Sequence, residues 1–314
     1  MIAPTRAQVK VLKTLQNQTV FLNAMVAEAT QAQQQSGQRP PPSWFEDYHH
    51  RAVVREELTN AAHAGGVPRA WIDHVRERGD RGLTWRADLY LRTPAALDWD
   101  PILGTLTTDA QRLCEWSALE VAYGPIGPAT DPGVAFDFDR NLAALRARTA
   151  GIANLLGLTA EQGHELWGAT SDWAQAGVAM LDGVPVDGLV QRWRAAAHTD
   201  IGAYGLQAAA LASAGITIDS AAALPPPEEL ASAIGAMYVP PHTLFRSAAT
   251  TGHDINAAIG AANLTYSADA AGRTGIEPAV FSDAASADPW FSDTTADIDI
   301  PAPEFLPPVQ EIER

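Results

Sequence analysis

The stretch LTNAAHAGGVPRAWIDHVRER, residues 58–78, indicates the fold class of this chain. Its Gly-Gly-Val-Pro turn separates two segments with a helical spacing of apolar residues, which predicts helices over 44–64 and 67–78. Gly66 suits the left-handed backbone that follows a helix, and Pro68 suits the first turn of the next helix, where a missing N–H costs nothing. Two helices joined by a short turn are typical of an all-α protein.

Beyond this corner the same periodicity predicts further helices, over 5–35, 107–123, 138–156, 160–181, 187–213, 227–238 and 242–263. Thr159 and Gln162 have the spacing of a capping box at the start of one of them. One segment has a different period: between Leu83 and Leu91, apolar residues alternate with others, which predicts a short strand. The expected fold class is nevertheless all-α.

The corner resembles the helix-turn-helix of bacterial DNA-binding proteins over about twenty residues. Ala62 is the small residue where the two helices would cross, Gly66 lies in the turn, and Ile72 and Val75, with Trp71, form the apolar face of the second helix. The resemblance implies that the second helix enters the major groove of duplex DNA.

A helix-turn-helix would turn Arg69, Ala70, Asp73, His74 and Glu77 towards the bases, with Arg69 placed for a guanine edge. The arginines expected to contact phosphates are Arg76, Arg78, Arg81 and Arg86. Residues 69–92 hold six arginines and four acidic residues, a surplus of two positive charges. The alternative interpretation is an ordinary two-helix corner, and the decisive feature is whether Asp73 and Glu77 are neutralised by neighbouring arginines.

The first helix carries an apolar seam with alternating spacings of three and four, made by Leu12, Leu15, Thr19, Leu22, Val26 and Ala29. Such a seam is compatible with a homodimer through residues 5–35. The apolar stripe is wider than a coiled-coil seam, so a helix packed on its own domain fits the pattern equally well.

Five regions follow from these features. They are a long coiled-coil-like helix (1–36), a Pro-rich linker (37–43), the helix-turn-helix-like region (44–100), an α-helical domain (101–265) and an acidic tail (266–314). The tail holds ten acidic residues and two arginines, a composition that predicts disorder. Its apolar islands, with Trp290 and Phe291 in one and Phe305 and Leu306 in the other, are candidate peptides for a protein partner.

Charge and cysteine content exclude several classes. The net charge of −16 excludes polyanion binding by bulk electrostatics, and three basic against fourteen acidic residues in 201–314 place the excess in the rear half. Cys114 is the only cysteine, so a disulfide within the chain is impossible, and its mid-helix position predicts an inert thiol. We find no signal peptide and no apolar run long enough for a membrane helix, and we expect a bacterial cytoplasmic protein.

Catalytic and metal-binding patterns are weak. The eight histidines have no ligand spacing, and no phosphate-binding or nucleophile motif is present, so we expect no metal, no cofactor and no enzyme. Trp167, Trp173 and Trp193 would fill a core, or alternatively line a pocket with Asp172, Arg192 and Arg194. The sequence thus favours a DNA-binding accessory protein with a partner-recruiting tail. The alternative is a non-enzymatic interaction or scaffold protein that does not bind nucleic acid.

Overall fold

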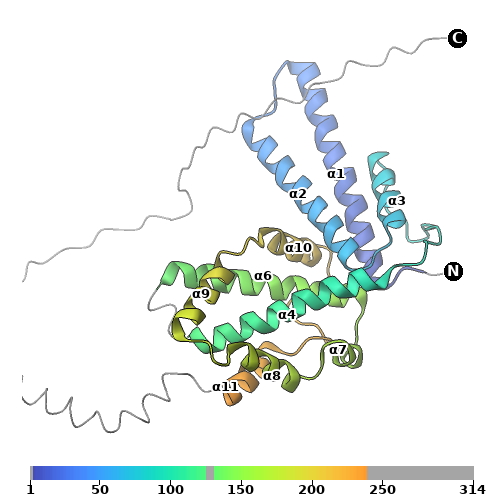
Figure 1. The fold of residues 1–314 in the computed structure, drawn as a ribbon. Helices are drawn as coiled ribbons and strands as arrows, with labels where there is room; N and C mark the ends of the chain where they lie inside the picture. Colours follow the sequence, from blue (N-terminus) through green and yellow to red (C-terminus); the bar gives the residue numbers. More distant parts are fainter. Residues whose placement is uncertain (1–2, 125–130, 239–314) are drawn as a thin grey trace, which may run out of the picture. The chain divides into compact units, whose positions relative to one another are not determined.

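The computed structural model describes residues 3–124 and 131–238, and within them it is all-α (Figure 1). The helices are α1 (Arg6–Ser36), α2 (Pro42–Ala64), α3 (Arg69–Asp80), α4 (Trp99–Tyr123), α6 (Pro132–Leu156), α7 (Ala160–Trp167), α8 (Thr170–Leu181), α9 (Val186–Ala197), α10 (Gly202–Ser213) and α11 (Pro227–Met237). None of the helices in these residues is long and apolar enough to cross a membrane.

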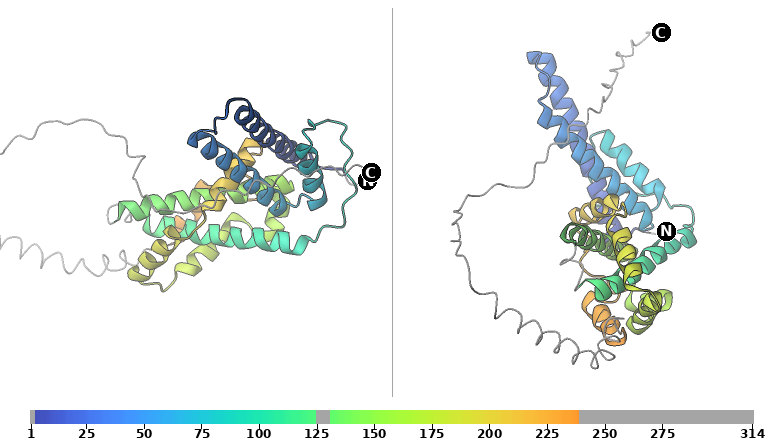
Figure 2. Two further views of the ribbon diagram at one scale, coloured as in Figure 1. Left: turned by 90° about the horizontal axis from the view of Figure 1, so that it is seen from above. Right: turned by 60° about the vertical axis from the view of Figure 1, so that its left-hand side comes forward.

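The helices pack around two apolar clusters. In the first cluster, α4 packs against α6, α8, α9 and α11, with Phe138 and Trp193 stacked at 5.4 Å between ring centroids. In the second cluster, α1 packs against both α2 and α3, and α10 packs against α2 and α6 (Figures 1 and 2). Helix α6 contributes to both clusters and so joins the N-terminal helices to the rest.

The corner has the predicted two helices and turn. Helix α2 ends at Ala64, Gly66 takes a positive φ of 68°, and α3 starts after Pro68. Trp71 and Ile72 are buried as expected, together with Val75. In a helix-turn-helix this apolar face would pack against the preceding helix, but here α3 packs chiefly along α1.

The close approach of α3 to α1 occurs at Gly79. A Cβ there would lie 2.6 Å from the Thr19 Cβ and 2.9 Å from the Gln16 carbonyl oxygen, so the backbones meet without a side chain between them. Asn23 donates a hydrogen bond of 3.3 Å to Asp80 beside this point. The position of α3 is therefore fixed by α1.

The strand predicted between Leu83 and Leu91 is wrong: the segment is a loop. Its Trp85, Leu89 and Leu91 pack against the second cluster, but no strand of the described residues pairs with it. Gln16 donates to the Leu83 carbonyl at 2.5 Å, and Trp71 donates to the Arg92 carbonyl at 2.6 Å. An alternation of apolar and polar residues thus indicates a segment with one side buried, and such a segment need not be part of a sheet.

Two predicted long helices are each broken. The helix expected over 160–181 divides at Gly168, whose φ of 81° and ψ of −179° are open to glycine alone. The helix expected over 187–213 divides after Ala197, where the Asn141 side chain donates to three carbonyls at the end of α9. The capping box of Thr159 and Gln162 is confirmed.

Helix α4 begins two turns earlier than the predicted start at residue 107. Asp98 caps it by accepting from the Asp100 N–H at 3.3 Å, and Pro101 lies in the first turn, where a proline removes no helical hydrogen bond. Helix α6 likewise starts before the predicted residue 138, with Asp131 as its cap.

The apolar seam of α1 is divided between two environments. Leu12, Leu15, Thr19 and Leu22 are buried in the chain's own second cluster or beside it, as the own-domain interpretation predicted. Val26 is 42% exposed, and no residue between 23 and 57 is buried. We call residues 23–57, the last part of α1, the turn and the first part of α2, the α1–α2 arm.

The predictions for residues 242–263 and for the acidic tail 266–314 lie outside the described residues. The same holds for Trp290, Phe291, Phe305 and Leu306, the proposed partner-binding residues of the tail.

Candidate functional site

The two acidic residues of the predicted DNA-reading face are both paired with arginines. Arg69 lies 3.7 Å from the Asp73 carboxylate, and Arg81 lies 3.1 Å from that of Glu77, each one helical turn away. Because both pairs are exposed to solvent, each contributes little to stability. Each pair nevertheless offsets the positive charge of an arginine that would otherwise be available to neutralise a DNA phosphate.

Two further arginines of the predicted interface are also paired. Arg76 lies 3.6 Å from Glu56 on α2, and Arg86 lies 2.9 Å from Asp88, where its hydrogen bond lowers the pKa of the carboxyl. Arg78 is half-buried, and its Nε atom has no hydrogen-bond partner within the described residues. The structure therefore places most of the expected phosphate contacts in ion pairs of the chain itself.

Two histidines lie at the corner, His63 on α2 and His74 on α3. His74 is half-buried on α3. Partial desolvation and the neighbouring Arg69 lower the pKa of His63, so this residue is neutral at pH 7. The corner consequently has the two-charge surplus expected from its sequence, spread over a surface where both signs alternate.

A different surface carries exposed apolar side chains. On the α1–α2 arm, Val26 is 42% and Phe45 is 54% exposed. Trp44 stacks on Tyr48 at 5.3 Å and meets Phe45 edge-on at 5.0 Å, so three aromatic rings gather in the first turns of α2. Sequence analysis missed this cluster, although the residues WFEDY, 44–48, directly after the linker are a visible signal.

The base of the arm is hollowed. A cavity of about 390 Å³ lies where α1 meets α2, and Phe21, His50 and Arg51 contribute to its lining. The Arg51 guanidinium lies 4.7 Å from the centre of the exposed Phe21 ring, a cation–π contact between the two helices. The arm thus joins a partly open groove to an aromatic cluster.

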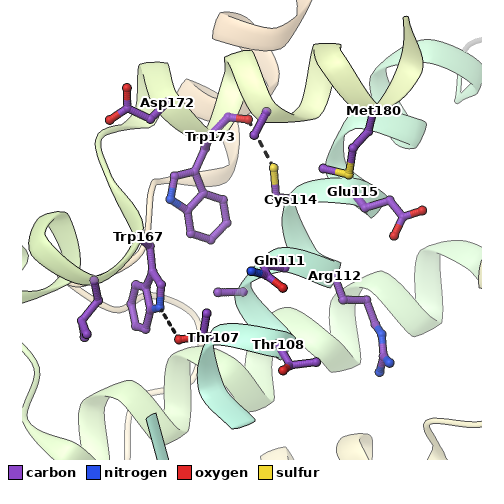
Figure 3. Close-up of a pocket in the computed structure, with 13 residues that line it drawn as sticks. Thr107, Thr108, Gln111, Arg112, Cys114, Glu115, Trp167, Asp172, Trp173 and Met180 are labelled. Atoms are coloured by element: carbon purple, nitrogen blue, oxygen red, sulfur yellow. Dashed lines mark hydrogen bonds between the residues drawn. The ribbon is translucent and has the colours of Figure 1, made fainter. Parts of the chain in front are cut away.

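A second cavity lies between α4, α7 and α8 and has a volume of about 670 Å³ (Figure 3). Trp167, Trp173 and Asp172 line it, as the alternative interpretation of the tryptophans required. Trp193 does not, because it is buried in the first cluster, where its ring also meets Tyr123 at 5.1 Å. Neither Arg192 nor Arg194 lines this cavity.

Cys114 lies in the wall of this cavity as a protonated thiol. Its Sγ donates to the Trp173 carbonyl at 3.2 Å, and burial raises the pKa of the thiol to about 11. A thiol held in this form at pH 7 is a poor nucleophile, which agrees with the inert cysteine expected from the sequence. The Cys114 thiol is therefore not a nucleophile for a molecule that enters this cavity.

Within residues 3–124 and 131–238, no three His, Cys, Asp or Glu side chains cluster as metal ligands would. Comparisons with protein-family models, curated proteins and solved structures find no match. The candidate sites are therefore compared by their own chemistry. They are a corner with a surplus of only two positive charges, an arm with exposed apolar side chains and a cavity with aromatic walls.

Proposed function

We propose that this chain is a non-enzymatic scaffold protein that self-associates through the α1–α2 arm. The observation that carries the proposal is the absence of any buried residue between 23 and 57, in a segment that contains Met25, Val26, Trp44, Phe45 and Tyr48. Helical segments whose large apolar side chains are exposed or only partly buried have little core of their own, and packing is what stabilises most helices in water.

A second copy of the chain is the occupant that fits the arm. Residues 14–38 contain one charged residue, Glu28, so two such helices can approach without repulsion in a molecule of net charge −16. Two helical hairpins that meet through apolar faces form a four-helix bundle, a common packing solution. Val26 and Ala29 continue the seam that starts in the monomer core, and supply the first layers of that contact.

Duplex DNA is the rival partner, through Arg69, Arg76, Arg78, Arg81 and Arg86. The pairing of Arg69 with Asp73 and of Arg81 with Glu77 weighs against it, because neutralising phosphates is what drives DNA binding. The arm itself holds three arginines against five acidic residues, so it has no surplus of positive charge for DNA.

The experiment is sedimentation of the full chain at tens of micromolar, with a matched set of variants. We expect a dimer for the parent and a monomer for the Val26→Glu/Phe45→Glu double variant, because two carboxylates would be buried in the bundle. Each substitution should weaken the dimer by about tenfold or more, roughly 1.4 kcal/mol. Phe136→Glu is the control, since Phe136 is 66% exposed on α6, away from the arm, and its variant should remain dimeric.

A monomeric parent, or loss of the dimer in Phe136→Glu alone, contradicts the proposal. The same preparation is mixed with duplex DNA at about 50 mM salt, where even non-specific contacts are favoured. Retardation that is lost in Arg69→Ala and Arg81→Ala would give the function to the corner instead.

A further inference from the structure

We propose that the cavity between α4, α7 and α8 is a binding site for an organic ammonium ion with an apolar body. This inference is independent of the arm. It depends on how the cavity is built, on its aromatic walls and on the balance of charge at its rim.

The helix break at Gly168 creates the cavity. In one continuous helix, Trp167 and Trp173 would be six residues apart and point to different faces, since the helical repeat is 3.6 residues. The left-handed Gly168 ends α7 and lets α8 start in a new direction, with the Asp172 carboxylate accepting from the Ala169 N–H at 2.7 Å. Figure 3 shows both indoles beside the same stretch of α4.

The two tryptophans are held in place before any ligand arrives. Trp167 donates from Nε1 to the Thr107 hydroxyl at 3.2 Å, and this half-buried ring forms a side wall. Trp173 is 4% exposed and forms the floor, and Met180 adds a polarisable thioether. Indole faces attract cations, and rings already fixed by packing lose little entropy on binding.

The polar residues of the rim carry two carboxylates and one guanidinium. Glu115 and Asp172 supply the negative charges and Arg112 the positive one. Within the described part of the chain, Glu115 has no ion-pair partner, and the same is true of Arg112. The rim therefore has a net negative charge, and so does the whole chain, at −16. The resulting electrostatic field attracts cations and repels anions.

The volume sets the size of the ligand. About 670 Å³ lies within the range of sites for small organic molecules and is far more than a bare ammonium group fills. Ala110 and Ala176 leave this space open, and with Leu166 they provide an apolar lining. A cationic head against the indoles, in the negative field of the rim, with an apolar body along the alanines, uses both parts of the site.

The experiment compares three probes of similar shape on the full chain: the phenyltrimethylammonium cation, its neutral isostere tert-butylbenzene, and the benzenesulfonate anion. Indole N–H resonances of the nitrogen-labelled protein report the location, because each of the nine tryptophans carries one indole N–H. We expect the cation to shift the Trp167 and Trp173 signals and to bind about tenfold more tightly than the neutral isostere. The anion should bind more weakly than either.

Charge variants test the rim. Glu115→Gln should weaken binding of the cation by about threefold or more and leave the neutral isostere unchanged, whereas Arg112→Gln should strengthen binding of the cation. Glu229→Gln, which removes one exposed carboxylate from α11, is the matched control and should change neither. Unshifted signals from the other tryptophans show that each variant is folded.

Three results would overturn the inference. They are equal affinity for the cation and its neutral isostere, tighter binding of benzenesulfonate, or shifts that spare both Trp167 and Trp173. Filling the cavity by Ala176→Trp must also abolish binding of the cation, and binding that survives this variant would place the site elsewhere.

Discussion

The Arg148–Asp109 pair and the Arg69–Asp73 pair have the same chemistry in opposite surroundings. The side chains of Arg148 and Asp109 are 6% and 3% exposed, whereas those of Arg69 and Asp73 are 83% and 65% exposed. The buried pair is also surrounded by partners: Arg148 donates to Gln207 at 2.6 Å and its guanidinium lies 4.1 Å from the centre of the Tyr204 ring.

The network around the buried pair joins four helices. Asp109 on α4 accepts from the Tyr204 hydroxyl of α10 at 3.1 Å, and Gln207 of α10 donates to Glu57 on α2 at 2.9 Å. Burial and the Asp109 carboxylate raise the pKa of Tyr204, so this side chain remains a donor at neutral pH. Arginine thus has a structural role inside this protein, while Arg69, Arg81 and Arg86 of the corner are held by exposed, local pairs.

The sharpest test of this difference is Asp109→Ala. It leaves the buried Arg148 charge without its carboxylate partner, and we expect a loss of about 3–5 kcal/mol in the free energy of unfolding. Urea denaturation followed by tryptophan fluorescence measures it. The double variant Asp109→Leu/Arg148→Met should recover much of the loss, because apolar residues of similar volume replace both charges. A cost below about 1 kcal/mol for Asp109→Ala would remove the distinction between the two pairs.

A smaller effect is expected where the corner is attached to α1. Gly79→Ala places a Cβ within 3 Å of Thr19 and of the Gln16 carbonyl oxygen, and this crowding should cost about 1–3 kcal/mol. Gly104→Ala is the matched control, since a Cβ at this helical glycine meets no atom within 4 Å. The control should be neutral or stabilising by up to about 1 kcal/mol. Equal results for the two glycines would mean that α3 is not held at this point.

Sequence reasoning predicted the helices well where local signals dominate. The all-α class, the turn at Gly66 and the cap at Thr159 follow from residue type and spacing, which act within one or two helical turns. The break at Gly168 was missed because an isolated glycine inside an apolar helical pattern is tolerated, and only its backbone angles show that the helix stops.

The candidate sites were harder to predict because they depend on contacts across the chain. Arg76 finds its partner Glu56 on another helix, and Asp109 finds Arg148 thirty-nine residues later. In the apolar seam of α1, the sequence does not distinguish Leu22, which is buried in the monomer, from Val26, which is exposed. Periodicity shows which face of a helix is apolar, but not what covers it.

The smallest expected effect concerns the exposed pairs of the corner. In a double-mutant cycle with Arg81→Ala and Glu77→Ala, we expect a coupling of about 0.3–0.5 kcal/mol in the free energy of unfolding, as for exposed pairs one turn apart on a helix. The same cycle for Arg69 and Asp73, which lie farther apart at 3.7 Å, should give no more. Both couplings should shrink in high salt, because the charges are accessible to screening ions. A coupling above about 1.5 kcal/mol that persists in high salt would contradict the surface role assigned to these arginines.

A weak coupling has a consequence for DNA binding. A phosphate could take Arg81 from Glu77 at little cost in free energy, so what opposes DNA binding would be the acidic charge of Asp73 and Glu77 themselves. Asp73→Asn/Glu77→Gln then isolates that factor: if duplex retardation appears in this variant alone, the acidic face is what keeps the corner off DNA.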